Sequence, residues 1–69
     1  MPLTYAGIGR TCVIRKIGGN TETKHFLESL GFVEGSTVTI MNDTGGNVIV
    51  NVMGSRVAVS KELATKIMI

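Results

Sequence analysis

Aromatic residues and cysteine are scarce in this chain of 69 residues. It has no tryptophan, one tyrosine, two phenylalanines, one cysteine and one proline. A single cysteine forms no internal disulfide and completes no zinc or redox motif. With only Tyr5, Phe26 and Phe32 as aromatics, the predicted strands lack the stacking platform on which small basic barrels bind single-stranded nucleic acid.

Charged residues are also few, and neither sign dominates. Seven Lys or Arg stand against five Asp or Glu, for a formal net charge of +2. This dispersed charge is too weak for a strong phosphate footprint, so we expect no nucleic-acid partner. The chain has no apolar run of membrane-spanning length and no signal-peptide pattern after Met1. We therefore expect a cytoplasmic protein that does not insert into a membrane.

Reactive side chains that could act together on a substrate are missing as well. Cys12 has only His25 as a possible base and no evident Asn or Asp to orient it, so Cys12 is interpreted as a small core residue. Gly18-Gly19 precedes a predicted helix but lacks the Gly-Lys-Ser/Thr ending of a phosphate loop. The carboxylates are scattered without an obvious catalytic pair: Glu22, Glu28, Glu34, Asp43 and Glu62. The sequence predicts no enzyme.

Apolar residues make up 43% of the chain, which is enough for a packed interior. A chain of this length buries only about 60% of its unfolded surface, so its stability should be modest. We find no repeat, linker or low-complexity segment. Residues 1–69 are therefore predicted to form a single domain.

The clearest local pattern predicts a helix over about 22–30. Its apolar face follows the i, i+3, i+4, i+7 spacing of a helix and consists of Thr23, Phe26, Leu27 and Leu30. Asn20 or Thr21 can cap the first turn. Gly31 is the expected stop, because that position usually needs positive φ. After it, 33–36 fits a type II turn with Gly35 at positive φ.

The remaining pattern is mainly β. A first strand is expected over 12–17, with a bulge returning Ile17 to the face of Cys12 and Ile14. Gly45-Gly46 is a two-residue hairpin signal, and Gly54 suits the first central position of a type II′ turn. Ser60 can cap a short helical turn near 61–65. About five short strands and one inserted helix favour a closed or nearly closed small barrel.

Several apolar side chains are expected on the outside of this barrel. Val13, Met41, Ile49 and Met53 fall on the outer faces of strands, and Phe32 lies in a bend that we expect to be exposed. Two interpretations stay open: a second layer of core, or a docking surface for a partner protein. In the second case the partner-binding residues are predicted to be Phe32, Ile49, Met53 and Arg56.

A metal site is the other candidate. His25 lies three residues from both Glu22 and Glu28 on the predicted helix, so these side chains share a region of its surface and could bind a divalent transition metal such as Fe2+. The same residues are typical of a solvated helix face. No resident cofactor is expected.

The order of motifs resembles the FeoA family, the small cytoplasmic accessory proteins of bacterial ferrous-iron uptake. The matching motifs cover nearly the whole chain: Gly9-x-x-Cys12-x-Ile14-x-x-Ile17-x-Gly19, Leu27-x-x-Leu30-Gly31-Phe32-x-x-Gly35-x-x-Val38, Val48-x-Val50-x-Val52-x-Gly54-x-x-Val57-Ala58-Val59 and Glu62-x-Ala64-x-x-Ile67. The resemblance implies an SH3-like barrel with an inserted helix.

The resemblance also implies a function and a partner. The partner would be the membrane ferrous-iron transporter with its cytoplasmic GTP-hydrolysing domain, at the inner face of the membrane. A similar domain occurs at the C-terminus of iron- and manganese-dependent repressors, so a metal-sensing module is the alternative. Weak self-association is left open. The resemblance supplies no catalytic residue and no metal ligand.

Two segments depart from the family pattern. Many members have proline where this chain has Glu34, so the turn here should be less rigid. Many also have a proline-containing segment where this chain has a short hairpin over 42–47. Any contact that the family makes through that segment is not expected here.

Overall fold

Short runs of β-branched residues, separated by turns, form six strands in this protein. The structure is a computed structural model that describes residues 1–69. Its elements, in chain order, are η1 (Leu3–Tyr5), β1 (Thr11–Val13), β2 (Lys16–Ile17), α1 (Thr21–Ser29), β3 (Thr37–Asp43), β4 (Asn47–Val52), β5 (Ser55–Ser60), α2 (Lys61–Ala64) and β6 (Ile67–Met68).

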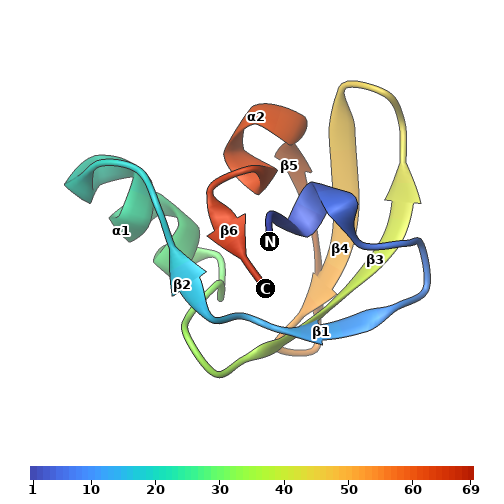
Figure 1. Ribbon diagram of the computed structural model, residues 1–69, viewed down its shortest axis with the longest axis horizontal. Coiled ribbons are helices and arrows are strands. Elements are labelled where there is room, and N and C mark those ends of the chain that lie inside the picture. The colour runs from blue at the N-terminus through green and yellow to red at the C-terminus, as the bar shows by residue number, and fades with distance from the viewer.

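The strands form two antiparallel sheets around one core (Figure 1). The larger sheet has the order β1-β3-β4-β5, and the smaller one pairs β2 with β6. Thirteen residues are buried and all of them are apolar. The expectation of a small, mainly β domain with one inserted helix is confirmed.

The strand predicted over 12–17 is divided into β1 and β2. β1 pairs with β3 and β2 pairs with β6, so the chain changes partners between them. At the change, the Arg15 N–H donates to the Met68 C=O across 2.8 Å. This exchange, rather than a bulge, lets both Ile14 and Ile17 reach the core. The number of strands is consequently six instead of about five.

The predicted helix is confirmed as α1, which begins after Asn20. The Asn20 Oδ1 accepts a hydrogen bond from the Thr23 N–H at 2.8 Å. At the other end, the Phe32 N–H donates to the Leu27 C=O at 3.0 Å, and Gly31 has φ of +106°. This is the Schellman arrangement, in which a residue with positive φ ends a helix.

The apolar face of α1 is narrower than its sequence pattern suggests. Leu27 is buried and Leu30 is half-buried, but Phe26 keeps 51% of its surface exposed. The prediction that Phe26 faces the core is therefore wrong. Because α1 lies at the side of the barrel (Figure 1), it buries a single stripe, and Phe26 is rotated by about 100° from Leu27 around the helix axis.

The glycine turns are mostly where the sequence predicts them. Gly35 has φ of +88° and the Ser36 N–H donates to the Val33 C=O at 3.1 Å, as in a type II turn. Gly45 and Gly46 occupy the tip of the β3–β4 hairpin, and Gly45 alone of the two has positive φ.

The β4–β5 turn is displaced by one residue from its prediction. Val52 pairs with Ser55, so the central residues are Met53 and Gly54. Both have positive φ, +53° and +77°. The turn is thus of type I′, whose twist matches the flanking strands, and not of type II′.

Candidate partner-binding surface

Phe32, the most prominent residue of the predicted docking surface, does not lie on the surface. It is fully buried and is the largest of the fully buried side chains. The Schellman turn at Gly31 directs the chain inward, so the bulky residue that follows enters the core. The expectation that Phe32 is exposed is wrong, and its side chain presents no contact area to a partner.

The other predicted partner-binding residues lie together on the β4–β5 hairpin. Arg56 is exposed opposite Asn51, and Ile49 is half-buried opposite Ala58. Alternate residues share one side of a strand, so Ile49, Arg56 and Ala58 all face outward while the valines face the core. Met53 stands at the tip of the same hairpin. The result is a small outer surface with an apolar centre and one guanidinium group.

Met53 is the unusual residue of this hairpin. It is 68% exposed, and it is the only non-glycine residue with positive φ. A Cβ on Gly31 would lie 3.2 Å from the Met53 Cγ, so the side chain rests against the end of α1. The Ser36 hydroxyl donates to the Met53 Sδ at 3.5 Å. These contacts hold a flexible apolar side chain at a defined place on the surface.

The end of β3 that leads into the β3–β4 hairpin is held to α2 by an ion pair. The Lys61 Nζ lies 3.2 Å from the Asp43 Oδ2, and the Gly45 N–H donates to the Asp43 Oδ1 at 2.9 Å. First the Gly45 amide and then the Lys61 ammonium hold the pKa of Asp43 below its usual value. Ser60 caps α2 as predicted, since its Oγ accepts from the Leu63 N–H at 3.2 Å.

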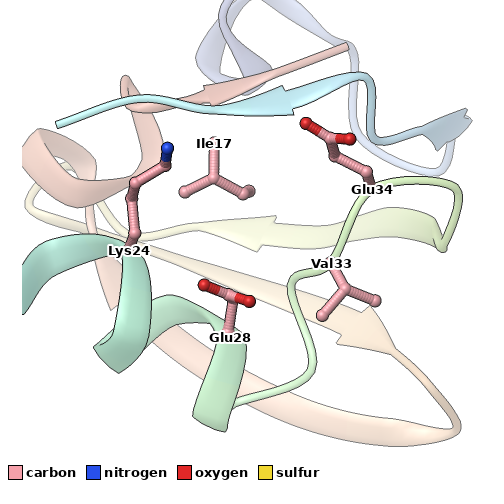
Figure 2. Close-up of a pocket in the computed structure, with 5 residues that line it drawn as sticks. All are labelled: Ile17, Lys24, Glu28, Val33 and Glu34. Atoms are coloured by element: carbon pink, nitrogen blue, oxygen red, sulfur yellow. The ribbon is translucent and has the colours of Figure 1, made fainter. Parts of the chain in front are cut away.

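A pocket of about 260 Å³ lies between α1, β2 and the turn after α1. Figure 2 shows Lys24 and Glu28 projecting from α1 and Glu34 from the turn, with Ile17 and Val33 beside them. Sequence reasoning did not single out this pocket. Lys24 and Glu28 are one helical turn apart, but only the fold brings Glu34 toward them.

The predicted metal residues do not form a cluster. Glu22, His25 and Glu28 are all exposed on α1. Nowhere in the protein do three or more His, Cys, Asp or Glu side chains come together in a way that could hold a metal ion. Cys12 is half-buried against the core and lines a second pocket of about 280 Å³ with Arg10 and Arg15.

The geometry defines a class of protein: a small, mainly β domain with an inserted helix, no convergent reactive groups and an outward-facing hairpin. None of its helices is long and apolar enough to cross a membrane.

Residues 1–69 match the FeoA domain family. The chain is 32% identical over 68 residues to Fe(2+) transport protein A of Methanocaldococcus jannaschii, with 99% of this chain and 83% of that protein covered. The chain therefore belongs to the FeoA domain family, as its motifs indicated. This membership places it among accessory proteins of Fe(2+) transport.

Solved structures agree with this assignment. A FeoA iron uptake regulatory protein superposes with a TM-score of 0.91 at 29% identity, covering 99% of this chain and 92% of the other. The zinc-complexed FeoA of Stenotrophomonas maltophilia, described as an SH3 domain protein, gives a TM-score of 0.84 at 24% identity, with 99% and 87% covered. The SH3-like fold is thereby confirmed.

A metal-dependent repressor shares the fold over part of its length. A manganese-dependent transcriptional repressor gives a TM-score of 0.85 at 17% identity, covering 97% of this chain but 39% of the repressor. At this identity the likeness concerns the fold alone.

Proposed function

We propose that this chain is a non-enzymatic accessory protein of ferrous-iron uptake that docks on the cytoplasmic GTP-hydrolysing part of the membrane ferrous-iron transporter. The docking surface is the outer side and tip of the β4–β5 hairpin: Ile49, Met53, Arg56 and Ala58. Family membership supports the pathway, and the hairpin supports the place of contact.

The observation that carries the proposal is the backbone of Met53. Left-handed φ costs a non-glycine residue roughly 1 kcal/mol, and such residues cluster at functional sites. Asparagine or glycine would make the same turn at lower cost. This chain instead has a long apolar side chain there, 68% exposed and supported by Gly31 and Ser36. Met side chains adapt well to apolar partner surfaces, so binding a partner would account for a methionine at this strained position.

The test is isothermal titration calorimetry with the purified cytoplasmic domain of the transporter from the same organism. Met53→Asn keeps the turn and removes the apolar contact, so we expect binding to weaken about tenfold, the loss of about 1.4 kcal/mol that marks a useful interface residue. Met41→Asn is the matched control, since Met41 is another exposed methionine but lies on β3. Equal affinity for the two variants, or no binding by the unaltered chain, would contradict the proposal.

A further inference from the structure

β5 is the long strand of this fold with an unoccupied edge. It is the last strand of the four-stranded sheet and runs over Ser55–Ser60, paired with β4 on one side only. The opposite end of that sheet is β1, which has three residues, and β2 and β6 have two each. Among the strands at the ends of the two sheets, only β5 offers an edge long enough to bind a further strand.

The hairpin register identifies the backbone groups along this edge. The two-residue turn makes Val52 and Ser55 a hydrogen-bonded pair, so Val57 and Val59 also turn their N–H and C=O groups toward β4. Arg56 and Ala58, which alternate with them, turn theirs away. Neither residue takes part in any backbone hydrogen bond outside the strand ladders, and both are exposed. Two N–H and two C=O groups thus face solvent in a row.

The β5 edge lacks most of the sequence and structural features that prevent another strand from pairing with it. Natural edge strands are blunted by lysine, proline, bulges or an inward-pointing charge. β5 has the sequence Ser-Arg-Val-Ala-Val-Ser, and its pairing with β4 is regular throughout. Its single charge is Arg56, which makes no ion pair within the protein. The backbone is therefore open, and the guanidinium beside it is free for a carboxylate.

We infer that the β5 edge is a strand-addition site for an extended segment of the partner that carries a carboxylate opposite Arg56 and β-branched apolar residues opposite Val57 and Ala58. This inference rests on the proposed function for the identity of the partner. Backbone hydrogen bonds to Arg56 and Ala58 provide affinity in such complexes, and the flanking side chains provide specificity. On the outer face, Ile49 and Asn51 of β4 lie directly beside these positions and extend the contact.

A second copy of this chain is a poorer occupant of the edge. Antiparallel pairing of β5 with itself would satisfy the backbone groups, but β5 contains no acidic residue to meet Arg56. A partner strand with a carboxylate satisfies both the backbone and the charge.

Binding at the β5 edge is tested with the whole chain in an experiment of two arms. In the first, the transporter's cytoplasmic domain is titrated into the unaltered chain, Ala58→Pro and Glu34→Pro. Proline at position 58 removes an N–H that the fold does not use, which edge strands tolerate. Glu34→Pro is the control, because Glu34 lies outside the docking surface at the second position of the type II turn, where proline is favoured. We expect Ala58→Pro to bind at least tenfold more weakly and Glu34→Pro to bind within about twofold, with unchanged circular dichroism.

The second arm does not need the transporter and does not depend on a proline variant. Amide exchange is followed by NMR with a capped peptide of about six β-branched residues containing one central glutamate, and with its lysine counterpart. We expect the glutamate peptide to slow exchange at Arg56 and Ala58 but not at Val57 and Val59, and Arg56→Gln to remove its advantage over the lysine peptide.

The outcomes of the two arms separate the two proposals. Failure of the domain to bind while the glutamate peptide protects Arg56 and Ala58 would refute the proposed partner and retain the edge site. Binding of the domain with equal affinity for Ala58→Pro, and no protection by the peptide, would refute the edge site. Protection that rises with protein concentration alone would also refute it, in favour of a second copy.

Discussion

Phe32→Ala separates a core role of this residue from a docking role. Phe32 is fully buried, and truncating a buried phenylalanine to alanine costs about 3–5 kcal/mol. A domain of this size has a total stability of roughly 3–10 kcal/mol. The variant should therefore lose between a third and all of its stability. Phe32→Leu is the control, because leucine stays apolar and fills most of the space of the ring, so it should cost clearly less stability than alanine.

Urea denaturation followed by far-ultraviolet circular dichroism is the suitable assay. The chain has no tryptophan, and its one tyrosine, Tyr5, is exposed and reports poorly on the core. A large loss of stability for Phe32→Ala, with a small loss for Phe32→Leu, would confirm a core role. The reasoning would be refuted by a loss below about 1 kcal/mol for Phe32→Ala together with weaker binding to the transporter domain, which is the behaviour of a surface residue.

Two further predictions concern the turns and the charges. Gly31→Ala should destabilise the protein by at least about 1 kcal/mol in the same assay, because φ is +106° and the new Cβ would lie 3.2 Å from the Met53 Cγ. Gly46→Ala is the control and should change stability little, because Gly46 has no positive φ and has open space around it. Equal losses of stability for the two variants would contradict this account. The lowered pKa of Asp43 predicts stability that is complete above the usual aspartate pKa and is lost as the pH falls through the lowered value. Asp43→Asn should flatten this acid limb in melts recorded at stepwise lower pH, and an unchanged limb would contradict the assignment.

Features set by neighbouring residues were predictable from the sequence. The cap at Asn20, the stop at Gly31 and the type II turn at Gly35 each depend on a local backbone requirement that few residue types meet. These cap, stop and turn residues, together with apolar periodicity, predict the helix and the main hairpins. The structure places all of these features within a residue or two of the expected positions.

Burial of particular aromatic residues was not predictable in the same way. Phe26 fits the helical apolar pattern and is half exposed, whereas Phe32 follows a glycine in a bend and is fully buried. Periodicity identifies one face of a helix but not how much of it the barrel covers. The direction of a side chain after a Schellman turn depends on where the core lies, and only the complete tertiary structure determines that. The expected exposure of Phe32 was consequently wrong, and the docking role of the hairpin residues stays a prediction.

Although Phe32 is buried, the bend after α1 and the tip of the β4–β5 hairpin form one region, because Met53 contacts Gly31. Phe32 enters the core immediately after Gly31, and Met53 covers Gly31 from outside. A substitution at Gly31 therefore disturbs a core residue, the end of α1 and the display of Met53 at once, so a loss of binding there would not identify the docking surface. Met53→Asn leaves Gly31 and Phe32 in place. The affinity of that variant, compared at equal stability, is thus the measurement that assigns docking to the hairpin tip and not to the bend.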